Sequence, residues 1–406
     1  MTCMEKLLAE LIALPSVNPA FAPQSGASAR QARLSRFGEK NVADFLASVA
    51  AKAGLEVEFQ NVLVLADGHH RSNLIVRLLP RNKIRRTILL APHLDTVDAD
   101  ESQFVPRVRN GRLYGRGACD TKGSVAAMLT ALCELAGARS RPNETAIIFA
   151  GLIDEEQAQA GSRALVRSSA FRRLGPSITP LDCLKAEFQT TFAIVGEPTR
   201  LQVVTAHKGS LWLQLETRGK AAHGATPQLG RNAVREMARI VCALEADYSA
   251  RLRKRKHPLL GSATVSVGTI CGGTQPNIVP DRCVISIDRR TLPGETETGV
   301  SREIAAFLRS KNLPAKIFST KLAPALPLET NPKLPLVRQF LRSIGQPKPR
   351  GVDFFCDAAV LSAGGIPSVV FGPGDIAQAH TKDEWISLTE LERGKNLLLK
   401  FLKSLP

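Results

Sequence analysis

The stretch AIIFAGLIDEEQAQAGSR, residues 146–163, joins an apolar run directly to three consecutive acids. The run up to Ile153 carries no charge, which is typical of a strand buried on both faces of a sheet. Asp154, Glu155 and Glu156 follow at once. Neighbouring carboxylates repel one another and are costly to desolvate, so something in the fold must offset the cost of placing them at the end of a core strand.

Similar apolar runs alternate with a helical stretch through the first half of the chain. The runs are SNLIVRLL, RTILLAPHLD, TAIIFAGLID and FAIVGEP, and the helical stretch is GSVAAMLTALCELAG. This order predicts the α/β class, with a mostly parallel sheet covered by helices on both faces as a three-layer domain. In such sheets, chemistry is expected just past the carboxyl ends of the strands, where His93, Asp95, the acids 154–156 and Glu197 lie.

The pattern of the chain changes after residue 204. Strand and helix patterns then follow in the order β-α-β-β-α-β, which is the split βαβ or ferredoxin-like arrangement. From residue 319 onward the α/β pattern returns. We therefore expect the first part of an α/β domain over 1–204, an inserted α+β domain over 205–318, and the second part of the α/β domain over 319–406.

The 406-residue chain has a formal net charge of +17 at pH 7 and 44% apolar residues. A large positive charge suits either a solubilising surface or the binding of anions such as nucleic acid. The basic residues are dispersed and the aromatic residues that stack on single strands are few, which favours the surface. The densest cluster, RLRKRKH at 251–257, is interpreted as a solvated loop after a helix, where nucleic-acid binding would be a secondary property.

The N-terminal segment has acids inside an apolar pattern of helical spacing that includes Leu7, Leu8 and Leu11. This pattern predicts an amphipathic helix rather than a signal peptide or a membrane span. The eight cysteines include no CxxC pair, so neither a zinc knuckle nor a disulfide framework is indicated. A cytoplasmic protein with no membrane partner is the simplest expectation.

Imidazole and carboxylate side chains gather where the predicted strands end. Any one of them alone is more typical of a helix cap, a solvated turn or an ordinary loop. Two histidines and several carboxylates at one sheet edge instead suit two divalent ions, because both groups bind zinc and a carboxylate can bridge two cations. The candidates are His93, Asp95, Asp120, Glu155, Glu156, Glu197 and His380. Residues two apart at a strand end point the same way, so Asp95 could accept the second ring N–H of His93.

Seven blocks of sequence, in chain order, resemble one known family. They are PHLDTV, GRGACDTKG, DEE, GEPT, AAHGATPQLGRNAV, GGTQPNIVPDRCVISIDRRTLPGE and GPGDIAQAHTKDE. The family is that of the dizinc deacylases and metallopeptidases, with acetylornithine deacetylase, succinyl-diaminopimelate desuccinylase, aminoacylase and glutamate carboxypeptidase. The resemblance covers nearly the whole chain. It implies a zinc-peptidase-like α/β domain with an inserted dimerisation, or lid, domain.

The resemblance also implies a set of metal ligands. Asp120 bridges two divalent metal ions, which are expected to be zinc with cobalt as an alternative. His93 and Glu197 complete one metal site, and Glu156 and His380 complete the other. The resemblance further implies a cis peptide bond after Asp120, which the residues alone would not have indicated.

Catalytic and substrate-binding roles follow from the same resemblance. Glu155 is the general base and acid, and Asp95 is the partner that orients His93. In the inserted domain, His223 reaches the partner subunit's site and helps stabilise the oxyanion, so a homodimer is expected. Asn277 and Arg290 match positions that bind substrate, and Arg290 is chosen over its neighbour by aligning R-x-L-P-G.

We therefore expect an amidohydrolase that removes an N-acyl group from an amino acid, most like acetylornithine deacetylase. A zinc-activated water would attack the amide, with Glu155 as general base. Glu197 in GEPT resembles the deacetylase and desuccinylase branches, so succinyl-diaminopimelate desuccinylase is the first alternative, followed by a dipeptidase or carboxypeptidase acting on short peptides. A binding protein without catalysis is disfavoured, because the ligand set and Glu155 are all present.

Overall fold

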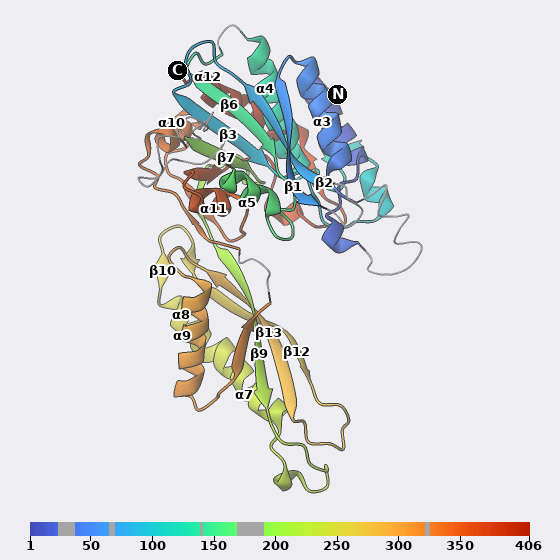
Figure 1. The fold of residues 1–406 in the computed structure, drawn as a ribbon, viewed down its shortest axis with the longest axis vertical. Coiled ribbons are helices and arrows are strands. Elements are labelled where there is room, and N and C mark those ends of the chain that lie inside the picture. The colour runs from blue at the N-terminus through green and yellow to red at the C-terminus, as the bar shows by residue number, and fades with distance from the viewer. Residues whose placement is uncertain (23–36, 65–69, 139–140, 169–190, 321–324) are drawn as a thin grey trace. The chain divides into compact units, whose positions relative to one another are not determined.

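The computed structural model describes residues 1–22, 37–64, 70–138, 141–168, 191–320 and 325–406 (Figure 1). The chain divides into two compact units. Unit 1 comprises Met1–Thr205, Thr330–Arg350 and Cys356–Pro406, and unit 2 comprises Ala206–Glu329 and Gly351–Phe355. Unit 2 is thus an insertion in the sequence of unit 1.

The central sheet of unit 1 has the strand order β1-β2-β6-β3-β7-β17. The strands are β1 (Glu56–Val64), β2 (His70–Leu78), β6 (Thr145–Gly151), β3 (Arg86–Pro92), β7 (Phe192–Gly196) and β17 (Ser368–Val370). The four strands β6, β3, β7 and β17 are parallel, whereas β2 is antiparallel to both β6 and β1. Every residue of β6 and β7 is buried, which agrees with the apolar runs that predicted them. The α/β class with a largely parallel sheet is confirmed.

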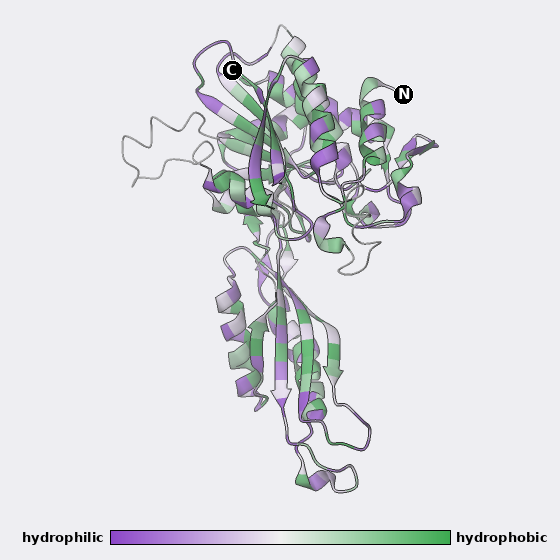
Figure 2. Cartoon of the chain, turned by 45° about the vertical axis from the view of Figure 1, so that its right-hand side comes forward, coloured by the Kyte–Doolittle hydropathy of each residue, from purple (hydrophilic) through white to green (hydrophobic). Residues whose placement is uncertain are grey.

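Helices pack on both faces of this sheet. The main core lies between one sheet face and the helices α1 (Cys3–Ala13), α3 (Lys40–Lys52), α4 (Lys122–Gly137), α10 (Pro335–Ile344) and α12 (Leu388–Lys403). On the other face, α5 (Ala160–Arg167) packs on α11 (Ala358–Ala363), and α11 contacts β7 and β17. Figure 2 shows both hydrophilic and hydrophobic residues on the helices that cover the sheet. A separate sheet in unit 1 consists of β4 (Arg107–Arg109), β5 (Arg112–Tyr114) and β18 (Trp385–Ser387).

Unit 2 has an antiparallel sheet of its own in the order β12-β13-β9-β14. Its main elements follow in the chain as β9 (Gly209–Arg218), α7 (Ala233–Ala243), β12 (Thr264–Gly272), β13 (Arg282–Thr291), α9 (Glu297–Ser310) and β14 (Lys316–Ser319). This is the β-α-β-β-α-β order of the split βαβ arrangement. Side chains from the sheet, α7 and α9 form the core of the unit. Short strands β8 (Val204–His207), β15 (Leu328–Glu329) and β16 (Arg350–Val352) lie where the chain passes between the units.

The basic segment 251–257 is not the loop that its composition suggested. After α7 the helix continues as a π-helical turn, Leu244–Tyr248, and then as α8 (Ser249–Arg253). Leu244, Tyr248 and Leu252 are buried at a spacing of four, so an apolar stripe extends the helix through the basic cluster. The segment ends in β10 (Lys256–His257), which pairs with β11 (Gly261–Ser262).

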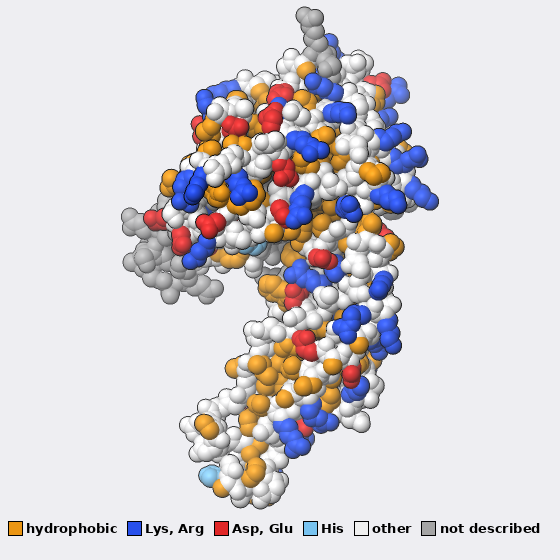
Figure 3. Space-filling model, turned by 180° about the vertical axis from the view of Figure 1, so that it is seen from behind, with side chains coloured by type: hydrophobic (Ala, Val, Ile, Leu, Met, Phe, Trp, Pro, Cys, Tyr) orange, Lys and Arg blue, Asp and Glu red, His pale blue; other side chains and the backbone are white. Residues whose placement is uncertain are grey.

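Basic residues of this segment are partly paired within unit 2. Arg255 forms an ion pair with Glu303 at 2.8 Å. On the face drawn in Figure 3, Lys and Arg side chains are spread among acidic and neutral ones rather than gathered in one patch. No helix in the described ranges combines the length and the hydropathy that a membrane crossing requires.

Candidate active site

The strand ends of unit 1 bring the predicted metal ligands together. His93 follows β3 directly, Glu156 lies in the turn after β6, and Glu197 follows β7 directly. Because these strands are parallel, their carboxyl ends lie at one edge of the sheet. Asp120 precedes α4, and His380 lies in the loop after β17. Five residues that are far apart in the sequence therefore meet at one site.

Asp120 stands at the centre of this site. Its Oδ1 lies 3.1 Å from Nε2 of His93, and its Oδ2 lies 3.4 Å from Nε2 of His380. His380 Nε2 is also 3.2 Å from Oε1 of Glu156, and His93 Nε2 is 3.8 Å from Oε1 of Glu197. One carboxylate therefore faces a different histidine with each oxygen, an arrangement that suits a ligand shared by two cations.

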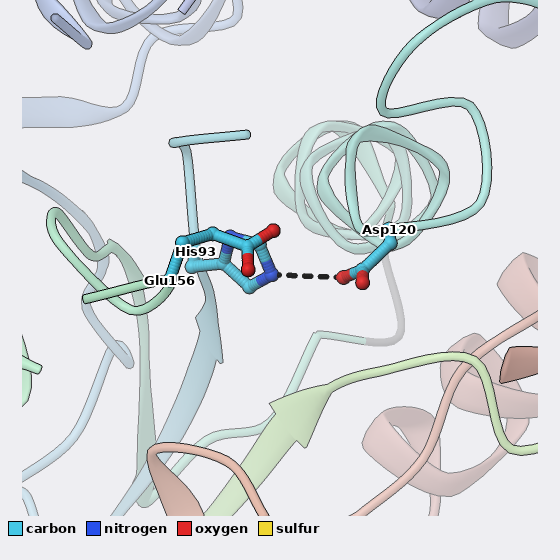
Figure 4. A group of neighbouring side chains, drawn as sticks. All are labelled: His93, Asp120 and Glu156. Carbon is cyan, nitrogen blue, oxygen red and sulfur yellow. Dashed lines mark hydrogen bonds and ion pairs between the residues drawn. The ribbon is translucent and has the colours of Figure 1, made fainter. Parts of the chain in front are cut away.

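Three of the side chains form a compact ligand cluster. One ligand atom from each of His93, Asp120 and Glu156 lies within 4.8 Å of the others. Figure 4 shows the His93 ring directed at the carboxylate of Asp120, with Glu156 coming from the neighbouring turn. Histidine nitrogen together with carboxylate oxygen is a donor set typical of zinc and similar divalent ions.

Burial and charge at this site also fit a metal centre. Burial raises the pKa of Glu155, Glu156 and Glu197, and the neighbouring carboxylates raise it further. Hydrogen bonds with Asp120 and Glu156 raise the pKa of His380 to about 10. Glu197 Oε1 is buried and has no hydrogen-bond partner among the described residues. Divalent cations would satisfy that oxygen and relieve the repulsion among the acids.

Metal removal should therefore destabilise the folded protein. Chelation with EDTA is expected to lower the Tm by several degrees, because ligand at a hundred times its Kd stabilises the native state by about 2.7 kcal/mol. Differential scanning fluorimetry with zinc, with EDTA, and after zinc is restored measures the effect. An unchanged Tm across the three conditions would contradict a metal centre that binds only the folded state.

Asp95 connects two of the elements that form the site. Its Oδ1 and Oδ2 accept the backbone N–H groups of Glu155 and Glu156, both at 3.1 Å. Nδ1 of His93 is 3.4 Å from Asp95 Oδ1 and 3.0 Å from the Asp95 carbonyl oxygen. Asp95 thus provides two acceptors beside the His93 ring, and its carboxylate also fixes the turn after β6.

Glu384 was not identified from the sequence, yet it holds the loop that carries Asp120. Its carboxylate accepts the N–H groups of Gly117, Cys119 and Asp120 at 3.1, 2.9 and 3.0 Å, together with Nη1 of Arg116 at 2.7 Å. The Asp120–Thr121 peptide bond in this loop is cis, as the resemblance implied. No local pattern marks Glu384, because its partners are more than 260 residues away in the chain.

Three further predicted residues lie in unit 2. His223 and Ile278 form an isolated antiparallel β-bridge, and the backbone carbonyl of Asn277 accepts the N–H of Gly224 at 2.7 Å. The loops that carry His223 and Asn277 are therefore adjacent. Arg290 on β13 is half-buried, with its guanidinium 5.8 Å from the centroid of the Phe355 ring. Arg289, by contrast, is fully buried and paired with Glu295 at 2.7 Å. Of these two arginines, Arg290 is the one with a partly exposed side chain, and its Nε lies 3.0 Å from Oδ2 of Asp288.

Comparison with known proteins identifies the family. Residues 89–404 match the model of peptidase family M20/M25/M40. The chain belongs to this family of metal-dependent hydrolases. Acetylornithine deacetylase of Myxococcus xanthus is 30% identical over 370 residues, which are 88% of this chain and 90% of that protein.

Solved structures of family members share the fold. Aminopeptidase PepT from Bacillus cereus has a TM-score of 0.72 at 20% identity, covering 98% of this chain and 97% of the other. The M20 family metallo-carboxypeptidase Sso-CP2 from Sulfolobus solfataricus has a TM-score of 0.72 at 18% identity and covers 99% of each chain. The resemblance seen in the sequence is thus confirmed at the level of family and fold.

Proposed function

We propose that this M20-family protein removes the acyl group from a small N-acylated amino acid, with N-acetylornithine as the first candidate substrate. The observation that carries the proposal is the meeting of five ligand side chains with Glu155 at one sheet edge. The acetylornithine deacetylase relatives support the choice of substrate. The family membership supports the reaction type, which is metal-dependent hydrolysis of an amide.

In this proposal the site holds two divalent ions, zinc being the first candidate and cobalt the second. Asp120 is the shared ligand because each of its oxygens faces a different histidine. His93 and Glu197 hold one ion, and Glu156 and His380 hold the other. Bound ions of this kind supply Lewis-acid polarisation of the substrate carbonyl and make a water more acidic.

Glu155 is proposed as the general base and acid. The residue is 8% exposed, and its backbone N–H donates to Oδ1 of Asp95 at 3.1 Å. Burial raises the pKa of Glu155. A carboxylate with a raised pKa accepts a proton more readily near neutral pH, which suits it to deprotonate water and then protonate the leaving amine. Asp95 is proposed to orient His93 through the acceptors beside the ring.

Unit 2 is proposed to act as a dimerisation and lid domain in a homodimer. His223 would stabilise the oxyanion in the partner subunit's site, while Asn277 and Arg290 would bind substrate. The half-buried Arg290 guanidinium suits a substrate carboxylate. A cytoplasmic location is supported by the seven described cysteines, which are all free, while Cys183 lies outside the described residues.

A substrate panel tests the proposed function. Zinc-loaded or cobalt-loaded protein should release acetate from N-acetylornithine faster than it cleaves N-succinyl-diaminopimelate, N-acetylmethionine or dipeptides. Preferred cleavage of the succinyl substrate would instead indicate a desuccinylase. Preferred cleavage of dipeptides would indicate a peptidase, which is the alternative that the solved peptidase relatives favour. No cleavage of any substrate would show that the deacylase proposal is wrong.

A further inference from the structure

Asp154 is the one acid of the DEE turn to which no metal or proton role is assigned. Its side chain is buried, with 4% of the residue exposed. Its backbone has φ of 67°, a left-handed conformation that Asp and Asn adopt more readily than other side chains. The next two residues are Glu155 and Glu156, so the conformation of Asp154 sets the direction in which both glutamates leave strand β6.

A buried cation holds the Asp154 carboxylate in place. Nη1 of Arg71 lies 3.1 Å from Asp154 Oδ1. The same guanidinium donates from Nε and Nη2 to the two oxygens of Glu39 at 3.0 and 2.5 Å. Glu39 Oε1 in turn accepts the backbone N–H of Asp154 at 3.3 Å. Both the side chain and the backbone of Asp154 are therefore tied to one buried Arg–Glu pair.

Asn18 is a second donor to the same oxygen of Asp154. Its Nδ2 donates to Asp154 Oδ1 at 3.0 Å and to Asp95 Oδ2 at 2.7 Å. Asn18 is fully buried, and its own Oδ1 accepts the N–H of Ala20 at 3.0 Å. Asp95 accepts the backbone N–H groups of Glu155 and Glu156. Asn18 therefore links Asp154 to the carboxylate that holds the next two residues.

We propose that Asp154 is a positioning residue which, held by Arg71 and Asn18, fixes the turn so that Glu155 and Glu156 face the metal site. The expected effect on turnover rests on the proposed function, whereas the expected effect on metal binding does not. The contacts of Asp154 with Arg71, Asn18 and Glu39 are hydrogen bonds or ion pairs between buried groups, where loss of one partner leaves the other unsatisfied. Groups that orient metal ligands in this way typically alter metal affinity or activity by about 10- to 100-fold when replaced.

The substitution Asp154→Asn tests this role with little change in shape. Asn keeps the size and the tolerance of a left-handed backbone but loses the charged acceptor for Arg71. We expect a kcat lower by about 10- to 100-fold with KM nearly unchanged, and cobalt affinity lower by a similar factor. The visible absorption spectrum of the cobalt-loaded variant should also change, because it reports the geometry around the ligand Glu156.

Arg71→Lys is the second variant. It keeps the positive charge but cannot make the bidentate hydrogen bonds of the guanidinium. It should show the same three changes to a smaller extent, and it decides the question if Asp154→Asn fails to fold. Lys395→Met is the matched control. It breaks the ion pair of Lys395 with Glu134 at 2.7 Å, between α12 and α4, and should lower the Tm while leaving kcat, cobalt affinity and spectrum unchanged.

The outcomes separate positioning from plain stabilisation. If Asp154→Asn and Arg71→Lys lower the Tm as Lys395→Met does but keep the kcat, the cobalt affinity and the spectrum of the wild type, the proposal is overturned. If the wild type cleaves no substrate of the panel, the proposed function fails. The cobalt affinity and the spectrum still decide the role of Asp154 in that case.

Discussion

Replacing Glu155 by Gln should remove nearly all turnover while the bound metal ions are retained. Glu155 is buried in the turn after β6 and has a raised pKa, but it is not one of the five proposed ligands. Gln has nearly the same shape and cannot take up a proton. General acid–base catalysis contributes about 10²- to 10⁴-fold, so we expect kcat to fall by that factor. Initial rates on the best panel substrate, with metal content measured by mass spectrometry, check both parts.

Glu101→Gln is the control for this prediction, because Glu101 is exposed on the short 3₁₀ helix Glu101–Phe104. It should have wild-type kcat and metal content. Retained turnover in Glu155→Gln would rule out Glu155 as the base. Lost turnover together with lost metal would show that the residue supports the metal site rather than proton transfer.

Removing the shared carboxylate should affect both metal ions, whereas removing one histidine should affect one. In Asp120→Ala we expect less than one tightly bound ion per chain and a loss of activity of about 10³-fold, equivalent to several kcal/mol of transition-state stabilisation. In His380→Ala we expect one tightly bound ion, because His93, Asp120 and Glu197 remain. Isothermal titration of zinc into the apo-proteins gives the two stoichiometries.

The difference in zinc stoichiometry between Asp120→Ala and His380→Ala tests whether Asp120 is shared by both ions. His257→Ala is a suitable control, because His257 pairs with Glu329 in unit 2 and is not a proposed ligand. It should bind zinc as the wild type does. Equal stoichiometries for Asp120→Ala and His380→Ala would contradict a bridging role for Asp120.

The core strands of unit 1 could be predicted from sequence because burial on both faces produces uninterrupted apolar runs. Strand β1 could not be predicted in this way. It lies at the sheet edge, pairs with β2 alone in the strand order, and has no buried residue among its nine. An edge strand does not need an apolar run. The antiparallel direction of β2 was also not apparent, because a buried apolar run fits either direction.

The same distinction applies to the site. His93, Glu156 and Glu197 were recognised because each stands at the end of an apolar run. Asp120 and His380 were candidates by residue type, and the family blocks then supplied their ligand roles. Asn18, Arg71 and Glu384 carry no such local signal. The Asn18–Asp95 bond spans 77 residues, and the Arg71–Asp154 bond spans 83. A buried hydrogen bond between distant segments becomes visible only when the fold brings its partners together.

The three acids that follow β6 can now be distinguished by their contacts. Asp154 is bound to Arg71 and Asn18, which offsets its burial without a metal. Glu156 faces His380 and belongs to the ligand cluster with His93 and Asp120, and Glu155 is proposed to carry the proton. Like charges are therefore tolerated at the strand end because their surroundings differ. Arg71 and Asn18 surround Asp154, and the proposed metal ions would lie beside the two glutamates.

Stepwise zinc titration of the apo-protein, with acetate release from N-acetylornithine followed at each step, tests the central claim most directly. We predict that apo-protein has negligible activity and that activity rises until two equivalents of zinc are bound. Apo-protein that hydrolyses N-acetylornithine as fast as the zinc-loaded form, or protein that binds no zinc, would contradict the account.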